Sequence, residues 1–490
     1  MILLLLTLSL RLLIIFFVFL FLYIIITQLI YFKLKFQNLS IYKKANIRTI
    51  SFVHPFCSDC GGKEKVLWRM ITSLISYNQN NQYQNFQKLK INIISGRKDD
   101  IQNLLQKLKI RFGIDLNKKQ NNNKNFVIEV ELISMESGYM LKSQNFFTKI
   151  FGIFGQIMFA CEIITKVYSD IYCDTTGLPF TYFILKYLGH AKITAYIHYP
   201  FISNEMIFKA SNINQRRKNK LINNIEFYYD KIILKLYKII GNRCISFAYT
   251  NSTWTLNQMK NIWDALYKKE KLLILYPPCS TLLYRDSANN EYRENIIVSF
   301  GQFHPENNQD IQIKILSQLK EKLSIYSPNF DDLEFHIIGF LRTNEDQQYL
   351  DYLIEYSKRL GVEKNVKFLV NKTIEEIKEE FSKAKIGINT MKENHFSISL
   401  IEMMAAGLIV IAHNSGGAKD DLLKDDGVIK PGFLVKNENE YIAQIEEILV
   451  RYNDIKGPLV NYSTQRAEKF SDETFSKQFL DNLNYFLFNI

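Results

Sequence analysis

Residues 385–421 read KIGINTMKENHFSISLIEMMAAGLIVIAHNSGGAKDD. The apolar residues 386–389 predict a short buried strand. After a polar turn, apolar side chains recur at helical spacing until Gly407 ends the helix. Residues 408–412 predict a second buried strand, which runs into a turn with two glycines. A strand, a helix and a strand in this order form half of a doubly wound α/β unit, in which ligands bind beyond the carboxyl ends of the strands.

The start of the predicted helix has the chemistry of an anion site. The first amides of a helix have no partner within the helix, and they carry the positive end of its dipole. Here these are the amides of Ile398, Ser399 and Leu400, and the small side chains of Ser397 and Ser399 let an anion approach the backbone. We therefore expect three open amide donors that suit a diphosphate.

This stretch resembles the Glu-x7-Glu segment of retaining glycosyltransferases with two Rossmann-like domains, which usually reads HFGIxxxE followed by AAG and NSGG. The resemblance implies that Glu402 holds the ribose of a nucleotide. Asn394 stands where that family has a first Glu that contacts the donor sugar, and Glu393 lies one residue out of register. Ser397 and Ser399 replace glycines of the family's phosphate loop. The alternative is an ordinary strand–helix–strand segment without a ligand.

The composition indicates a large globular protein in a reducing compartment. A chain of 490 residues with 47% hydrophobic content suffices for two or three domains. The net charge of +12 is scattered along the sequence, which favours a membrane surface or phosphates over nucleic acid. Six cysteines are too few for a disulfide framework. Cys57 and Cys60 form a CxxC without a second pair, so a turn is preferred over a metal or redox site.

The N-terminal residues 1–32 predict a transmembrane anchor. Residues 12–32 are almost wholly apolar, and about 20 such residues span a bilayer. Several lysines follow directly, so the positive-inside rule places the body of the protein in the cytosol. A cleaved signal peptide is the alternative, although no small-residue cleavage site follows the run.

The first domain is expected at residues 45–280. It begins with a strand and the sequence HPFCSDCGGKEKVLW, in which Gly61 and Gly62 permit backbone amides to lie close to a ligand. This sequence resembles HPYCNAGGGGERVLW of the GDP-mannose-dependent α-1,2-mannosyltransferases that extend the dolichol-linked oligosaccharide. IYCDTTGLPF and ITAYIHYPFIS resemble the same family's DTxGYAF and YVHYPTIS. By resemblance, His198 lies beside the reacting carbon of the donor sugar; the alternative is a core histidine.

Two apolar stretches of the first domain allow two interpretations. Residues 146–160 form either a core helix or a segment at the bilayer interface. Residues 227–241 carry Lys231, Lys235 and Lys238 on one face of a predicted helix, above an apolar remainder. Ordinary packing and membrane contact both explain this pattern.

The second domain is expected at residues 293–462, after the breaker Pro277-Pro278 and a polar stretch. Its first strand contains NIIVSFGQF, which resembles the family's SVGQFRPEKNH. Gln302 is shared, whereas His304 and Asn307 stand where an Arg and a Lys normally contact the phosphates. Lys419, in SGGAK, keeps a cation near this site. Residues 465–490 predict a final helix that packs back on the first domain.

The sequence therefore predicts a GT-B fold, with two Rossmann-like α/β domains facing a cleft after a transmembrane helix. The resemblance implies transfer of mannose from GDP-mannose, in α-1,2 linkage and with retention, to a dolichyl-diphosphate oligosaccharide of the Man3GlcNAc2 type on the cytosolic face of the endoplasmic reticulum. No Asp-x-Asp occurs, so no metal is expected. Other membrane-bound mannosyltransferases are further expected partners. The alternatives are a transferase of a UDP-sugar and a non-catalytic scaffold.

Overall fold

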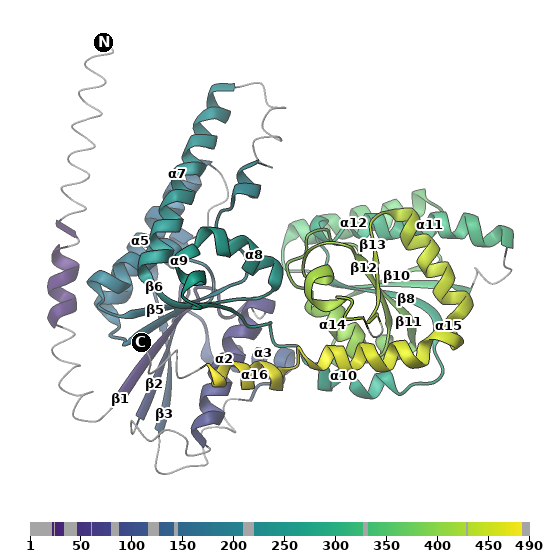
Figure 1. Ribbon diagram of the computed structural model, residues 1–490, viewed down its shortest axis with the longest axis horizontal. Helices are drawn as coiled ribbons and strands as arrows, with labels where there is room; N and C mark the ends of the chain where they lie inside the picture. Colours follow the sequence, from purple (N-terminus) through teal and green to yellow (C-terminus); the bar gives the residue numbers. More distant parts are fainter. Residues whose placement is uncertain are drawn as a thin grey trace. The chain divides into compact units, whose positions relative to one another are not determined.

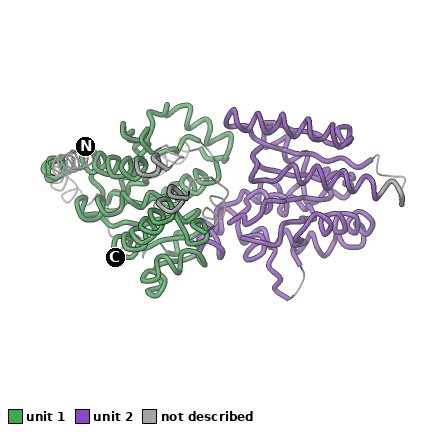
Figure 2. The backbone as a smooth tube through the Cα atoms, turned by 90° about the horizontal axis from the view of Figure 1, so that it is seen from above, with its two compact units in different colours: residues 1–250, 256–273, 479–490 green, residues 251–255, 274–478 purple. Residues whose placement is uncertain are grey.

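The computed structural model describes residues 22–23, 25–33, 47–59, 61–79, 88–115, 127–141, 146–208, 220–326, 332–427 and 430–482. The chain divides into two compact units (Figure 2). Unit 1 comprises residues 1–250, 256–273 and 479–490, and unit 2 comprises 251–255 and 274–478. Unit 2 therefore adjoins unit 1 along the chain at three places, namely the short segment 251–255 and the two ends, Ile274 and Gln478, of the segment 274–478.

Unit 1 is built on a seven-stranded sheet with the order β3-β2-β1-β4-β5-β6-β7. The pairings from β3 to β6 are parallel. The strands are β1 (Ile47–Val53), β2 (Lys88–Ser95), β3 (Val127–Ser134), β4 (Ile171–Asp174), β5 (Lys192–Ile197), β6 (Ile245–Thr250) and β7 (Leu272–Ile274). The helices are α2 (Gly62–Gln79), α3 (Ile101–Phe112), α5 (Phe146–Lys166), α7 (Lys220–Cys244), α8 (Thr253–Ile262) and α9 (Asp264–Lys268).

The two ambiguous apolar stretches fall in helices of unit 1 (Figure 1). Helix α5 contains residues 146–160, and it contributes Phe159 and Ala160 to the core that also holds strands β4 to β6. Helix α7 contributes Ile233 and Tyr237 to the same core. Its opposite face leaves Ile232 59% exposed, so part of its apolar surface has no cover among the described residues.

Unit 2 is built on a six-stranded parallel sheet with the order β10-β9-β8-β11-β12-β13. The strands are β8 (Glu294–Gln302), β9 (Glu334–Phe340), β10 (Val366–Val370), β11 (Ala384–Asn389), β12 (Ile409–His413) and β13 (Phe433–Val435). The helices are α10 (Thr281–Ala288), α11 (Gln309–Tyr326), α12 (Asn344–Arg359), α13 (Ile374–Lys383), α14 (Ile398–Ala405), α15 (Glu438–Glu468) and α16 (Asp472–Asp481).

Alternate strand residues of unit 2 enter two separate cores, because successive side chains of a strand point to opposite faces. Ile297 packs in one core with helices α11, α12 and α15, whereas Ile296 and Val298 pack in the other with α10, α13 and α14. Both faces are therefore covered. The predicted alternation of strands and helices is confirmed, including the helix that stops before Gly407, whose φ is 79°.

The N-terminal anchor remains a prediction, because residues 1–21 and 24 lie outside the described part. The described residues 22–23 and 25–33 are helical. Gln28 and Tyr31 of this helix donate hydrogen bonds to the carbonyls of Leu188 and Gly189 in unit 1. Among the described residues, no helix is both long enough and apolar enough to cross a bilayer.

Candidate active site

Each sheet reverses its strand order at one place, and the sequence features gather there. In unit 1 the reversal lies between β1 and β4, and in unit 2 it lies between β8 and β11. Crevices at the carboxyl ends of strands beside such a switch point are the usual ligand sites of doubly wound sheets. Residues 303–308 follow β8, and the β11–α14 loop, Thr390–Ser397, follows β11.

Direct hydrogen bonds join the two loops at the switch point of unit 2. The Thr390 hydroxyl donates to the carbonyls of Asn307 (2.9 Å) and Asn308 (3.1 Å). The Asn308 side-chain amide returns a bond to the Thr390 carbonyl at 3.2 Å. The structure therefore brings together the GQFHPENN and NHFSIS motifs, which lie about 90 residues apart in the sequence.

The three predicted residues at the end of β8 and in the following loop have protein partners. The side-chain amide of Gln302 donates to both carboxylate oxygens of Asp346, at 2.8 and 3.0 Å. Asn307 donates to the Gln302 carbonyl at 2.7 Å, and the His304 ring accepts from the Glu306 amide at 3.4 Å. Gln302 and Asn307 therefore shape the loop through these bonds. Their contacts with a nucleotide remain a prediction.

The glycine turn after β12 packs against the β11–α14 loop. The Gly417 amide donates to the Asn394 carbonyl at 2.8 Å, and the Ser415 hydroxyl accepts from the Glu393 amide at 2.8 Å. A Cβ on Gly416 would lie 2.2 Å from the Asn394 carbonyl oxygen, so only glycine permits this approach. The Gly416-Gly417 pair thus allows the two loops to touch.

The first turn of α14 differs from the prediction at one amide. The Ser397 side chain caps the helix and accepts from the Leu400 amide at 3.3 Å. The expectation of an open Leu400 amide is therefore wrong, because a serine at the N-cap supplies its own acceptor. Within the described residues, the amides of Ile398 and Ser399 donate to no protein acceptor. Binding of an anion by these two amides remains a prediction.

The predicted sugar and ribose residues occupy buried positions around this turn. Asn394 is 8% exposed, and its side-chain oxygen accepts from the Phe396 amide at 3.2 Å. Glu402, one turn into α14, is 9% exposed. Glu393 is exposed and has a φ of 53°, a left-handed conformation that is uncommon outside glycine. Lys419 is also exposed, and its ammonium has no protein partner among the described residues.

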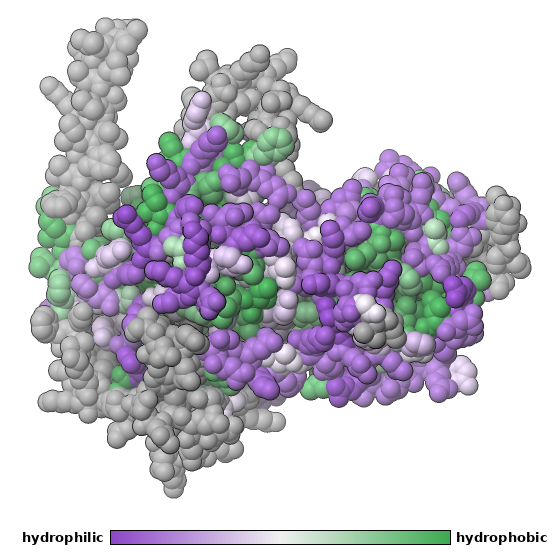
Figure 3. All heavy atoms as spheres, in the orientation of Figure 1, coloured by the Kyte–Doolittle hydropathy of each residue, from purple (hydrophilic) through white to green (hydrophobic). Residues whose placement is uncertain are grey.

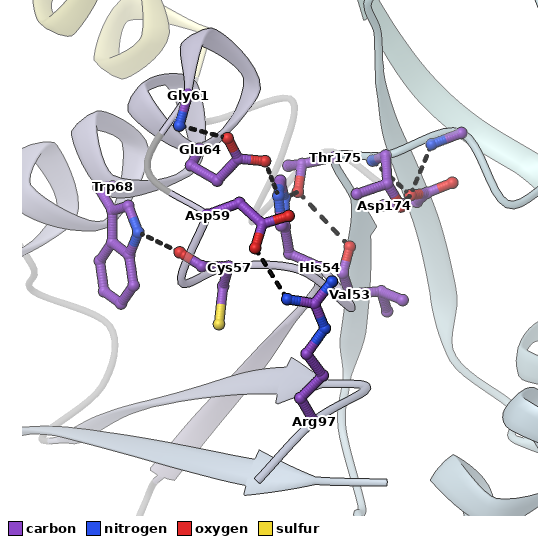
Figure 4. A network of polar contacts seen from close by, with 12 residues as sticks. Val53, His54, Cys57, Asp59, Gly61, Glu64, Trp68, Arg97, Asp174 and Thr175 are labelled. Atoms are coloured by element: carbon purple, nitrogen blue, oxygen red, sulfur yellow. Dashed lines mark hydrogen bonds and ion pairs between the residues drawn. The ribbon is translucent and has the colours of Figure 1, made fainter. Parts of the chain in front are cut away.

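A buried polar network occupies the switch point of unit 1 (Figure 4). His54 follows β1 and is fully buried, with Nε2 3.0 Å from Glu64 Oε1 and Nδ1 2.7 Å from the Thr175 hydroxyl. The other carboxylate oxygen of Glu64 accepts from the Gly61 amide at 2.6 Å. The Gly61 amide therefore has a protein partner in the third residue of α2, and a ligand contact of Gly61 and Gly62 remains a prediction. Gly62 is the first residue of that helix.

Glu64 is ionised in this network. Burial raises its pKa, but the hydrogen bond and charge of His54 and the bond from the Gly61 amide outweigh burial, so the pKa is lowered overall. A carboxylate at the third position of a helix that also bonds back to the residue before the helix is half of a capping box. The spacing of Gly61 and Glu64 in GGKE could have revealed this contact, whereas the partnership with His54 depends on the fold.

The next strands carry the remaining predicted residues of unit 1. Asp174, at the end of β4, accepts bonds from the Thr176, Gly177 and Leu178 amides and from the Tyr182 hydroxyl, at 2.6 to 3.0 Å. His198, directly after β5, is 7% exposed, and its ring lies 4.8 Å from that of Tyr196. Asp174 thus satisfies three amides of the turn that follows it. The role of His198 beside a sugar remains a prediction.

The CxxC cysteine that the structure describes is buried, in surroundings that disfavour the thiolate. Cys57 is fully buried, and burial together with the charge of Asp99 raises its pKa to about 12. Its thiol lies 3.8 Å from that carboxylate. Cys60 lies outside the described residues. Among the described residues, no cluster of three His, Cys, Asp or Glu side chains could hold a metal ion.

Two α/β units with parallel sheets, an open helix N-terminus at one switch point and a Glu one turn further define the class of GT-B glycosyltransferases. The solved structures agree on the fold. Sucrose-phosphate synthase from Thermosynechococcus elongatus is 13% identical with a TM-score of 0.61, over 90% of this chain and 99% of that chain. HepE of Anabaena in complex with UDP is 16% identical with a TM-score of 0.58, over 89% and 99%.

The sequence comparisons are more specific. Residues 47–263 match the family described as ALG11 mannosyltransferase N-terminus, and residues 283–456 match glycosyl transferases group 1. The GDP-Man:Man(3)GlcNAc(2)-PP-Dol alpha-1,2-mannosyltransferase of Xenopus tropicalis is 30% identical over 93% of this chain and 91% of its own. The Homo sapiens protein of that name is 29% identical over 89% and 87%. The chain belongs to this family of α-1,2-mannosyltransferases.

Proposed function

We propose that this chain transfers mannose from GDP-mannose, in α-1,2 linkage and with retention, to dolichyl-diphosphate-linked Man3GlcNAc2. Family membership supports the reaction. The observation that carries it structurally is the first turn of α14, where two open amides lie at a switch point between the loops that follow β8 and β12. A sugar nucleotide would place its diphosphate there.

The proposed chemistry needs an acceptor for the charge that develops as GDP departs. The amides of Ile398 and Ser399, with the ammonium of Lys419, would stabilise the leaving diphosphate, and the acceptor hydroxyl would attack the same face of the mannose. Glu402 would orient the ribose, Asn394 the mannose, and His198 the sugar near the reacting carbon. Because His304 and Asn307 stand where the family has an Arg and a Lys, the phosphate subsite would depend more on the two amides.

One assay separates this function from its alternatives. Purified full-length protein is incubated with GDP-mannose or a UDP-sugar and a phytanyl- or dolichyl-diphosphate trimannosyl acceptor. Mannosylated product from GDP-mannose alone is expected. Product only with a UDP-sugar would show that the donor is a UDP-sugar and not GDP-mannose. No product with either donor would favour a non-catalytic scaffold. Family membership supports GDP-mannose, and no observation on this chain favours the alternatives.

The Glu402→Gln variant tests whether the assayed activity belongs to this site. The change keeps the shape and removes the charge that accepts ribose hydrogen bonds, so donor affinity should fall by about 1.5–3 kcal/mol, roughly ten- to a hundredfold. Asn394→Glu and Glu393→Gln then identify the sugar contact. Loss of transferase activity in Glu393→Gln would assign the sugar contact to Glu393, which lies one residue out of register. Full complementation of a transferase-deficient cell by Glu402→Gln would refute the site.

The transfer is proposed to need no divalent metal. Backbone amides and a lysine would do the work that a metal does in transferases with an Asp-x-Asp pair. Activity should therefore persist in excess EDTA, after the protein has been passed over a chelating resin. Loss of activity in EDTA, restored by Mg²⁺ or Mn²⁺, would contradict this part of the proposal.

The proposed location is the endoplasmic reticulum membrane, with residues 1–32 as anchor and the body in the cytosol. Helix α7 supports a membrane contact, because exposed apolar side chains recur on one face beside Lys231 and Lys235. These apolar residues are Tyr228, Ile232, Leu236 and Ile239. Green apolar side chains reach the surface in this part of unit 1 (Figure 3). Lysines beside an apolar stripe suit anionic lipid headgroups.

Glycosylation reports the side of the membrane. Asn371, in an Asn-Lys-Thr sequence, and Asn461, in an Asn-Tyr-Ser sequence on α15, are exposed, whereas Asn251 of Asn-Ser-Thr is 1% exposed. Asn38, of Asn-Leu-Ser, lies outside the described residues. A cytosolic body leaves all four unmodified. The expected result is no mobility change after enzymatic deglycosylation of the expressed protein. A shift that changing Asn371 and Asn461 together to Gln abolishes would place the body in the lumen.

A further inference from the structure

An aromatic cluster packs against the β11–α14 loop. The ring of Phe396, between Asn394 and Ser397, is stacked on Tyr276 with centroids 5.9 Å apart and an interplanar angle of 24°. Phe470 packs edge-on against both rings, at 5.0 Å from Tyr276 and 5.8 Å from Phe396. Phe396 is 7% exposed and Phe470 is 4% exposed. The loop that carries the proposed sugar and phosphate contacts is thus packed on two residues remote from it in the sequence.

A buried carboxylate fixes the Tyr276 ring. The Tyr276 hydroxyl donates to Asp421 at 2.9 Å, and the Thr253 amide donates to the same carboxylate at 3.0 and 3.3 Å. Asp421 is 3% exposed and lies two residues after Lys419. Burial and the charge of Asp421 raise the pKa of Tyr276 to about 12, so the hydroxyl keeps its proton at neutral pH. Asp421 therefore links the Lys419 turn to the aromatic cluster.

The cluster and its partners lie at or near the three places where unit 2 adjoins unit 1 along the chain. Thr253 lies in residues 251–255, and Tyr276 lies two residues after Ile274, where the segment 274–478 starts. Phe470 lies eight residues before Gln478, where that segment ends, and its carbonyl accepts from the Cys279 amide at 2.9 Å. Contacts within unit 2 therefore connect the β11–α14 loop to the chain near all three places.

We propose that Tyr276 and Asp421 are positioning residues for the donor, which hold the β11–α14 loop in its binding conformation and connect it to the chain near the three places where unit 2 adjoins unit 1 in sequence. This inference rests on the proposed function, since it takes the loop to be the donor site. A loop that is held before binding costs less to order when the ligand arrives. Neither residue needs to touch the donor.

The test uses Tyr276→Phe, which keeps the ring and removes only the hydroxyl. The matched control is Tyr349→Phe, which removes a Tyr–Asp hydrogen bond of 3.4 Å to Asp310 in the same unit. We expect Tyr276→Phe to raise the KM for GDP-mannose about three- to tenfold at nearly unchanged kcat, since one hydrogen bond to a charged group is lost. The control should leave both constants unchanged.

Asp421→Asn is the second variant, because it keeps the volume and an acceptor for the Thr253 amide. It should raise the same KM. Hydrogen exchange then separates positioning from general stability. GDP should slow exchange in peptides covering 251–255 and 274–280 of the wild type and of Tyr349→Phe, and it should do so less in Tyr276→Phe and Asp421→Asn. Equal protection in all four proteins would overturn the inference. So would an unchanged KM for GDP-mannose in both Tyr276→Phe and Asp421→Asn.

Failure of the proposed function gives a different result. The exchange experiment is run with GDP and with UDP on the wild-type protein. If only UDP protects, the GDP-mannose donor is wrong, and the same variant comparison with UDP still decides the role of Tyr276. If neither nucleotide protects the wild type, the loop is not a nucleotide site and both proposals fall.

Discussion

Helices α2 and α14 both begin at a switch point, but only one of them offers its first turn to a ligand. In α2, the third residue is Glu64, whose carboxylate takes the Gly61 amide and pairs with His54. In α14, the third residue is Leu400. All residues of this first turn are among the described ones, and none of them is acidic. An anion is stabilised at a helix N-terminus. The first turn of α2 thus contains its own anion, whereas the first turn of α14 leaves two amides open to an external anion.

The comparison teaches that a glycine-rich turn at a switch point does not by itself mark a phosphate site. The Gly61-Gly62 turn satisfies the local pattern, yet its carboxylate would repel a second anion. The Ser397–Ser399 turn departs from the family's glycines and still leaves two amides open. Charge at the third helical position, rather than glycine content, distinguishes the two turns.

The largest expected effect comes from releasing the far end of α14. Arg293 donates to four carbonyls at the ends of α10, α13 and α14, namely Ser287, Phe381, Ala384 and Ala406, at 2.6 to 2.8 Å. Arg293→Met leaves these buried acceptors without a donor, so unit 2 should lose about 3–5 kcal/mol of unfolding free energy. Denaturant unfolding followed by a probe in unit 2 measures this. A loss below about 1 kcal/mol would mean that water replaces the guanidinium.

Placing a carboxylate in the first turn of α14 should make it resemble α2. Ser399→Asp sets a negative charge beside the two open amides, and GDP affinity should fall about ten- to a hundredfold through like-charge repulsion. Ser399→Asn is the control, since it has the same size without the charge. Calorimetric titration with GDP gives both values. Equal affinities for the two variants would show that the diphosphate lies elsewhere.

The converse change in unit 1 should affect stability and leave nucleotide binding intact. Glu64→Gln weakens the bonds to His54 and Gly61 and should cost about 1.5–3 kcal/mol of unfolding free energy at pH 7. The pKa of Glu64 is lowered below its ordinary 4.5, so this contribution is present above pH 4.5 and is lost as the pH falls through the folded-state pKa. The wild-type advantage over Glu64→Gln should therefore shrink on acidification. An advantage that is constant down to pH 3, or weaker GDP binding by the variant, would contradict this.

The smallest expected effect concerns the exposed cation beside α14. Lys419→Met removes one solvent-screened charge from the proposed diphosphate site, so GDP affinity should fall only about two- to fivefold. The difference should diminish as the salt concentration rises. Lys424→Met, on an exposed lysine of the same unit, serves as the control. A loss of a hundredfold would assign Lys419 a direct contact instead of a screened one.

Local chemistry sufficed to predict much of the fold and the outline of the site. Apolar patterns predicted β11, α14 and β12, and Gly407 marked the end of α14, whereas the two-domain transferase was inferred from the resemblance of the motifs to a known family. These features depend on residues within a few positions of one another, because turns, caps and amphipathic faces are formed locally.

Tertiary structure decided which of the predicted groups are open. Hydrogen bonds from Thr390 to the residue 307–308 carbonyls, and from Tyr276 to Asp421 across 145 residues, exist because the strand order places distant segments at one edge of a sheet. The His54–Glu64 pair depends likewise on where β1 ends relative to α2. A sequence pattern identifies donors and acceptors, but their partners are settled only when the sheets bring remote loops within hydrogen-bonding distance, because a buried polar group takes whichever partner the packing supplies.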